Sequence, residues 1–165
     1  MKTILLMRHS HAVSDNSAYS DHQRPLSEAG RILAVETSQL LQDISIDRVI
    51  CSSAARTVET ADLVSKTCGL DAVPDVTQSL YLAPPDSYRT IGAKVAEPAD
   101  QTLTIIGHNP GIASLICQWA GDSMSVPPAT VAIFYLQIDN WTELTSGHSL
   151  RPELVGFISS GVRHR

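Results

Sequence analysis

A short apolar run, Ile4 to Met7, ends abruptly at Arg8 and His9. Consecutive apolar residues suit a strand that is buried on both faces, as in a parallel sheet covered by helices on each side. In open α/β sheets, ligands bind beyond the carboxyl ends of the strands. The run therefore predicts a central strand that carries a guanidinium and an imidazole to the edge where ligands bind.

Further along the chain, helix-like and strand-like patterns alternate. Helices are predicted over residues 27–42, 54–68, 85–95 and 112–120. Strands are predicted over residues 47–52, 73–76, 101–106 and 130–138, with 141–145 as the hairpin partner of the last one. The tail, 147–165, has only weak patterning. The alternation indicates an α/β fold: a three-layer αβα sandwich with a mainly parallel central sheet, helices on both faces and an antiparallel C-terminal strand.

Size and charge restrict the class of protein. A chain of 165 residues fits one domain, residues 1–165, and its 43% of apolar residues is enough for a real core. The formal net charge of −5 argues against general binding to nucleic acid or to an anionic membrane surface. No stretch approaches the roughly 20 apolar residues of a membrane-spanning helix.

The cysteine pattern indicates the cellular compartment of the protein. Cys51, Cys68 and Cys117 lie far apart, and none belongs to a C-x-x-C pair. Neither a zinc ribbon nor a disulfide framework is indicated, and an odd number of cysteines fits reduced thiols. The run from Ile4 to Met7 is too short for the apolar region of a signal peptide. We therefore expect a cytoplasmic protein.

Four residues with suitable chemistry follow the ends of predicted strands: Arg8, His9, Arg56 and His108. Guanidinium groups match phosphate oxygens in bidentate geometry. Arg56 falls in the first turn of its predicted helix, where backbone N–H groups favour an anion. A neutral imidazole is a competent nucleophile toward phosphorus. The set predicts a site for a phosphate dianion with a histidine positioned to attack it.

Four segments containing these residues resemble signatures of the histidine phosphatase (phosphoglycerate-mutase-like) superfamily. They are, in family order, Arg8-His9-Ser10, Arg24-Pro25-Leu26-Ser27-Glu28-Ala29-Gly30, Ser52-Ser53-Ala54-Ala55-Arg56-Thr57-Val58-Glu59-Thr60 and Gly107-His108-Asn109. The family patterns are Arg-His-Gly, Arg-Pro-Leu-(Thr/Ser)-x-x-Gly, Ser-x-x-x-Arg-Thr-x-Glu-Thr and Gly-His-(Asn/Ser). The short length and compact middle of the chain most resemble the SixA-type phosphohistidine phosphatases within this superfamily.

The resemblance implies a role for each matching residue. His9 would be the nucleophile and would become a phosphohistidine. Arg8 and Arg56 would bind the phosphoryl oxygens, and His108 would hydrogen-bond the phosphoryl group and stabilise its charge in the transition state. Arg24 would add a further contact to the phosphate or the substrate. The resemblance implies no metal and no cofactor, because the arginines supply the positive charge.

Two departures from the family patterns affect the expected chemistry. Ser10 replaces a glycine, a residue that usually marks a special backbone angle. Residues 78–91 contain no glutamate that could act as general acid, and Asp86 is their only carboxylate. This favours a leaving group that needs little protonation, such as the imidazole of phosphohistidine, and leaves Asp86 open as an acid. Ser10 and Asn109, which follow the two histidines, are further candidate substrate contacts.

The resemblance thus implies a metal-independent phosphatase that works through a phosphohistidine intermediate. The expected partner is a phosphorylated histidine-containing signalling or phosphotransfer protein, and phosphate is the product. One alternative is a phosphomonoesterase for a small phosphorylated substrate. Another is a catalytically weak phosphate- or phosphoprotein-binding module, suggested by the missing glutamate and Ser10. A mutase is disfavoured, since the chain lacks both the acid and the insertions that would enclose a sugar phosphate.

Overall fold

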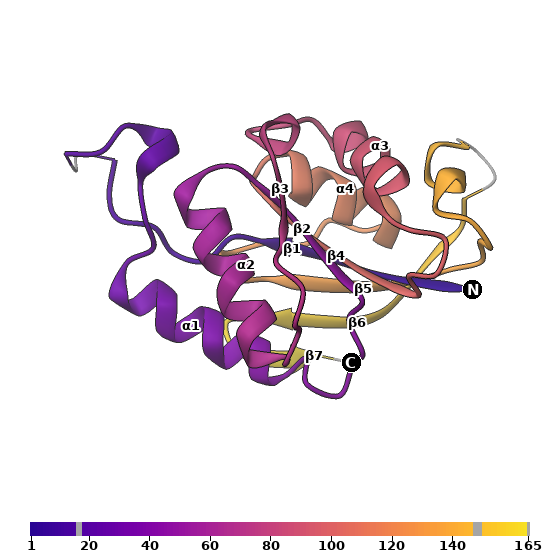
Figure 1. Cartoon of the computed structure of the whole chain (residues 1–165), viewed down its shortest axis with the longest axis horizontal. Helices are drawn as coiled ribbons and strands as arrows, with labels where there is room; N and C mark the ends of the chain where they lie inside the picture. Colours follow the sequence, from indigo (N-terminus) through magenta and orange to yellow (C-terminus); the bar gives the residue numbers. More distant parts are fainter. Residues whose placement is uncertain (16–17, 147–149, 165) are drawn as a thin grey trace.

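The computed structural model describes residues 1–15, 18–146 and 150–164, and in this part of the chain a seven-stranded sheet forms the centre (Figure 1). Its strands are β1 (Lys2–Arg8), β2 (Arg48–Ser52), β3 (Asp75–Thr77), β4 (Thr102–Gly107), β5 (Val131–Leu136), β6 (Pro152–Ser159) and β7 (Val162–His164). Their order across the sheet is β3-β2-β4-β1-β5-β6-β7. The first four are parallel to one another, whereas β5, β6 and β7 are antiparallel to their neighbours.

Helices cover both faces of this sheet. The α-helices are α1 (Glu28–Gln39), α2 (Ala55–Thr67), α3 (Pro85–Val95) and α4 (Gly111–Ala120), and the 3₁₀-helices are η1 (Asp21–Gln23), η2 (Gln78–Leu80) and η3 (Trp141–Thr145). Helices α1 and α2 lie on one face and α3 and α4 on the other (Figure 1). The predicted three-layer α/β fold is confirmed. None of the helices in the described residues is long and apolar enough to cross a membrane.

The burial of β1 on both faces explains why its apolar run is unbroken. Ile4 and Leu6 pack into the core under α3 and α4, and Leu5 and Met7 pack into the second core under α1 and α2. Side chains alternate between the two faces of a strand, so a strand covered on both sides needs apolar residues at every position. The buried strand thereby fixes the position of the residues that follow it.

The register of the parallel strands sets what lies at their carboxyl ends. Arg8 of β1 pairs with Gly107 of β4, and the backbone N–H of His9 donates to the Gly107 carbonyl at 3.0 Å. On the other side of β4, β2 ends at Ser52, one residue after Cys51 pairs with Ile106. The residues that follow β1, β2 and β4 therefore emerge side by side at one edge.

The C-terminal part of the chain differs from the prediction. Residues 141–145 form η3 rather than a strand, because the Asn140 side chain and Glu143 make a capping box that starts a helical turn. The hairpin partner of β5 is β6 instead. The tail, whose sequence patterning is weak, contains β6 and β7, joined by Ser160 and Gly161 with φ of +53° and +72°. Positive φ at both turn residues is typical of a tight hairpin. Residues 147–149 and 165 of this tail lie outside the described residues.

Candidate active site

His9 presents one ring nitrogen to the site. Its Nδ1 lies 2.7 Å from the Ser10 carbonyl oxygen, which can only accept, so Nδ1 carries the proton. The bare Nε2 lies 3.3 Å from Nε of Arg56, which can only donate. Burial, together with the charges of Arg56 and Arg8, lowers the pKa of His9 to about 4, against the opposing effect of the hydrogen bond to Ser10. His9 is therefore neutral near pH 7, with the lone pair of Nε2 available.

His108 lies beside it at the end of β4. The two imidazole centroids are 5.2 Å apart with their planes at 61°. Nε2 of His108 lies 2.7 Å from the Ser52 hydroxyl, and Nδ1 lies 3.4 Å from Nη2 of Arg56. Burial, with smaller contributions from His9 and Arg56, lowers the pKa of His108 to about 3. Both imidazoles are thus neutral side chains held within a cationic surrounding.

The backbone around His108 is held by a buried tyrosine of α3. The Tyr88 hydroxyl accepts from the His108 N–H at 3.0 Å and lies 3.3 Å from the His108 carbonyl oxygen. The tyrosine ring lies against Gly107, where a Cβ atom would meet it at 2.3 Å. This explains why a glycine precedes the histidine: a side chain there would displace the tyrosine that orients the His108 backbone.

Arg56, in the first turn of α2, connects the elements of the site. It is only 2% exposed. Its Nε and Nη2, which share one edge of the planar guanidinium, face His9 and His108 at 3.3 and 3.4 Å. Nη1 donates to the Asp21 carbonyl at 2.5 Å, and Nη2 also donates to Asp21 Oδ2 at 3.1 Å. The contacts to the imidazoles are long for hydrogen bonds, so this edge can take two oxygens of an anion instead.

Arg8 and Arg24 also retain donors for an anion. Arg8 Nη1 donates to the Val126 carbonyl at 2.9 Å, and Arg24 donates to the Val13 carbonyl and to Asp21 Oδ1, both at 2.9 Å. The Nε groups of both arginines are buried and have no hydrogen-bond partner among the described residues. An unpaired buried donor is costly, and an anion that reaches it removes that cost.

Ser10 does not belong to this cluster. Its hydroxyl is fully buried and donates to the Gly30 carbonyl at 2.7 Å, and its N–H donates to the Thr60 hydroxyl at 3.1 Å. The side chain therefore ties His9 to α1 and α2, which corrects its candidacy as a substrate contact. Ser10 is not among the described residues with positive φ, so the turn does not require the family's glycine.

Two other candidate site residues, Asn109 and Asp86, differ in their relation to the cluster. The Asn109 amide donates to the Val126 carbonyl at 3.1 Å, which is also the acceptor of Arg8, and its Oδ1 is buried without a partner in the described structure. Asn109 thus borders the site through a shared carbonyl. Asp86 has a side chain that is 84% exposed and pairs with Arg89 of its own helix at 3.6 Å. Its contacts do not connect it to the histidines.

The sequence analysis missed Asp21 and Tyr81. The Tyr81 hydroxyl donates to Asp21 Oδ2 at 2.5 Å, and the Tyr81 ring meets the His108 ring edge-on with centroids 5.5 Å apart. Hydrogen bonds from Tyr81, then Arg24 and Arg56, hold the pKa of the Asp21 carboxyl well below its usual range. Asp21 precedes Arg24 by three residues, a spacing that could have indicated a pair on one helical turn. No sequence signal connects Tyr81 with this loop.

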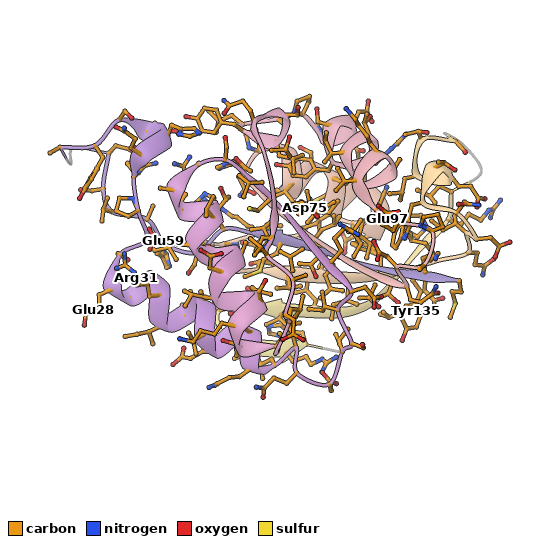
Figure 2. The ribbon with its side chains drawn as sticks, viewed as in Figure 1. Glu28, Arg31, Glu59, Asp75, Glu97 and Tyr135 are labelled. Carbon is orange, nitrogen blue, oxygen red and sulfur yellow. The ribbon has the colours of Figure 1, made fainter. Side chains whose placement is uncertain are left out.

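The segment that carries Arg56 also braces the two helices beside the site. Glu59 accepts from the Leu26 N–H at 3.2 Å and pairs with Arg31 at 2.8 Å. Figure 2 shows Arg31 of α1 and Glu59 of α2 next to one another. The Thr57 hydroxyl donates to the Ser52 carbonyl at 2.8 Å, which fixes the start of α2 against the end of β2. Thr57 and Glu59 of this segment are therefore positioning residues.

The assembled site has three guanidinium groups and two neutral imidazoles, with the Asp21 carboxylate bound to two of the arginines. The arrangement suits a tetrahedral dianion placed between Arg56 and the histidine pair. Within the described ranges, no group of three or more His, Cys, Asp or Glu side chains has a geometry that could hold a metal ion.

Comparisons with known proteins bear on the family and the fold. A profile described as histidine phosphatase superfamily (branch 1) matches residues 4–77. A structure assigned as phosphohistidine phosphatase SixA from Nakamurella multipartitia is 27% identical with a TM-score of 0.81, covering 96% of this chain and 95% of that one. The protein histidine phosphatase SixA complexed with tungstate is 18% identical with a TM-score of 0.78, covering 96% and 97%, a likeness of fold.

Among curated proteins, an uncharacterized chloroplastic protein of Arabidopsis thaliana is 28% identical over 154 residues, 86% of this chain and 70% of that protein. The matched profile begins within β1 and ends with β3, and so includes His9, Arg24 and Arg56. His108 lies outside it and is brought to the same place by the sheet. Over residues 4–77, this chain is therefore similar to branch 1 of the histidine phosphatase superfamily.

Proposed function

We propose that this chain, as a single domain over residues 1–165, is a phosphatase that hydrolyses the N–P bond of phosphohistidine in a protein. The supporting observation is the His9 Nε2 atom, which is unprotonated and lies 3.3 Å from the guanidinium edge of Arg56. The Asp21 carboxylate, which contacts both Arg24 and Arg56, is held ionised and has no proton to give a leaving group. Such a site suits a leaving group that departs without an acid.

The first step is attack of His9 Nε2 on phosphorus as the bond from phosphorus to the leaving nitrogen breaks. Arg56 takes two phosphoryl oxygens on its Nε/Nη2 edge, and the unpaired Nε of Arg8 takes another. Once the phosphoryl oxygens replace His108 Nδ1 as the acceptor for Arg56 Nη2, the Ser52 hydroxyl can turn to donate to His108 Nε2, and the proton of His108 then lies on Nδ1, facing the phosphoryl group. Donors aimed at the developing charge lower the barrier.

In the second step, water attacks phospho-His9 and releases phosphate. The Ser10 carbonyl keeps the proton on Nδ1 of His9 throughout, so the ring leaves phosphorus as a neutral imidazole. Three guanidinium groups supply the positive charge that a metal supplies in other phosphatases, and the proposed reaction uses neither metal nor cofactor. The tungstate held by the SixA structure is a phosphate-like anion, which supports an oxyanion as the ligand here.

The proposed partner is a phosphorylated histidine-containing protein of the signalling or phosphotransfer kind. The net charge of −5 disfavours nucleic acid and anionic membranes as partners. All three cysteines are free thiols, in accord with the proposed cytoplasmic location.

A substrate panel tests this proposal. Phosphohistidine proteins, a small phosphoramidate and p-nitrophenyl phosphate are assayed with wild type and His9→Ala, with and without EDTA. We expect the largest kcat/KM on phosphohistidine, loss of activity in His9→Ala and no effect of EDTA. A larger kcat/KM on the ester would favour the phosphomonoesterase. Equal hydrolysis by wild type and His9→Ala would leave a binding module, and inhibition by EDTA would contradict the metal-free reaction.

A further inference from the structure

The Asp21 carboxylate is a site component that the proposed reaction does not yet use. Its Oδ1 accepts from Arg24, and its Oδ2 accepts from Arg56 and Tyr81. A carboxylate offers about four acceptor positions, and these contacts take three of them. The Asp21 side chain is 47% exposed, whereas that of Arg56 is 3% exposed. The carboxylate thus keeps acceptor capacity on the solvent side of the buried cluster.

Arg56 places this carboxylate next to the reacting atoms. One edge of its guanidinium faces the nucleophilic Nε2 of His9, and the same Nη2 atom that closes this edge also holds Asp21 Oδ2. A phosphoryl group on the Arg56 edge would therefore have His9 on one side and Asp21 close to the solvent side. The leaving group of a phosphorylated protein must extend toward solvent, since the protein that carries it cannot enter the core.

The charge of Asp21 discriminates between leaving groups. A fixed carboxylate repels the anionic oxygen that develops when a phosphate ester is cleaved. It attracts the protonated form of a phosphorylated imidazole, in which the second nitrogen carries an N–H and the ring a positive charge. Hydrogen bonds from Tyr81 and the two arginines keep the pKa of Asp21 low, so the charge is present at neutral pH.

We propose that Asp21 determines specificity by accepting a hydrogen bond from the free ring N–H of a phosphohistidine substrate, so that the site prefers N–P bonds to O–P bonds. This inference rests on the proposed function.

The step balances without an added acid. The reacting substrate ring is the imidazolium form, bonded to phosphorus through one nitrogen and carrying on the other a proton that was taken from water and is held by Asp21. As His9 Nε2 forms its bond to phosphorus, the electron pair of the breaking P–N bond stays on the substrate ring, which leaves as neutral imidazole with its proton in place. The product phospho-His9 has the same arrangement, with its Nδ1 proton held by the Ser10 carbonyl. Water later takes the phosphoryl group.

Asp21→Asn tests the inference, with Asp15→Asn as the matched control. Asp15 lies in the same loop and pairs with Arg24, but its contacts do not include Arg56 or Tyr81. The measured quantity is the ratio of kcat/KM on N-phosphoimidazole to kcat/KM on p-nitrophenyl phosphate. We expect Asp21→Asn to lower this ratio about tenfold or more, the size of a lost charged hydrogen bond, and Asp15→Asn to leave it unchanged.

An equal loss on both substrates would overturn the inference, because it would mean that Asp21 only holds Arg56 in place. Asp21→Glu retains the charge and should keep more of the preference than Asn; a preference no greater than that of Asn would also count against it. If Asp21→Asn does not fold, Asp21→Ala supplies the uncharged variant for the same comparison. If the wild type shows no His9-dependent hydrolysis of N-phosphoimidazole, the proposed function itself fails. If the wild type prefers it and Asp21→Asn keeps that preference, only the role of Asp21 fails.

Discussion

Two charged networks lie at opposite ends of the parallel strands, and they differ in how completely their polar groups are paired. At the amino ends, Lys2 Nζ donates to the carbonyls of Pro98 and Asp100 at 2.9 and 2.6 Å. Arg48 pairs with Asp75 at 2.9 Å and with the Asp100 carboxylate at 2.6 Å. Each of these cations has two protein acceptors, so this network holds the strand starts together and offers little to a ligand.

At the carboxyl ends, by contrast, some of the buried donors lack a protein partner in the described part of the chain. Arg8 and Arg24 have buried Nε groups without partners in the described residues, and His9 and His108 are kept neutral by burial. Unpaired donors reduce stability unless an anion binds them. The difference between the two ends indicates that one network is built for stability and the other for a ligand. Substitutions at each end should therefore separate activity from stability.

The largest effect is expected for Arg56→Lys compared with Arg48→Lys. Lysine cannot offer the two-pronged edge that faces His9 and His108, so kcat/KM should fall about 10²–10³-fold, as for loss of one transition-state donor. Arg48→Lys should lower the free energy of unfolding and leave kcat/KM of the folded protein near wild type. Steady-state kinetics and urea titration of both variants measure this. A similar loss of activity in both variants would break the distinction between the two ends.

Asp100→Asn at the amino end comes next. Asp100 accepts from Arg48 Nε at 2.6 Å and from the Glu97 N–H at 2.8 Å, and its side chain is 12% exposed. Removing its charge should destabilise the protein by about 1–3 kcal/mol, because the ion pair with Arg48 is largely shielded from water. Activity should not change. Denaturant unfolding checks the first expectation, and a kcat shift of more than about twofold, beyond ordinary surface effects, would contradict the second.

The pH dependence of stability should come from the carboxyl end. The pKa values of His9 and His108 in the folded protein, about 4 and about 3, lie below the ordinary 6.5. Above pH 6.5 the two histidines are neutral in both the folded and the unfolded protein. As the pH falls below 6.5, the histidines of the unfolded chain take up protons, whereas those of the folded protein do not. Stability is then lost, by up to about 1.4 kcal/mol per pH unit for each histidine, until the folded pKa is reached.

Unfolding measured at pH 7 and pH 5 tests this expectation. His9→Gln should reduce the slope in this window, since one of the two groups is removed. A stability that is the same or higher at pH 5 in the wild type would contradict the assignment of both histidines as buried and neutral.

The smallest effect is expected for Ser10→Gly, which restores the family's residue. The Ser10 hydroxyl donates to the Gly30 carbonyl away from the site, so kcat/KM should stay within about twofold of wild type, as for a change outside the site. Loss of this hydrogen bond should cost about 1 kcal/mol of stability. Thermal unfolding and kinetics measure both. A large gain in activity would show that serine distorts the turn after His9.

The sequence predicted the parallel part of the fold because β1 must be apolar at every position, and that requires helices on both faces. It also predicted that His9, Arg56 and His108 lie at one edge of the sheet, since each follows a parallel strand. It did not predict η3, where the local capping by Asn140 and Glu143 outweighed the β-forming residues. The contact between Asp21 and Tyr81 joins residues 60 positions apart, and no local pattern encodes it.

The proposed reaction requires that His9 Nε2 becomes phosphorylated during turnover. Rapid quenching under alkaline conditions of the enzyme with a ³²P-labelled phosphohistidine protein measures this most directly, followed by peptide mapping and ³¹P NMR of the trapped species. We predict an acid-labile label on Nε2 of His9 that decays at the rate of phosphate release. Turnover without any labelled enzyme, or a label on another residue, would contradict the account.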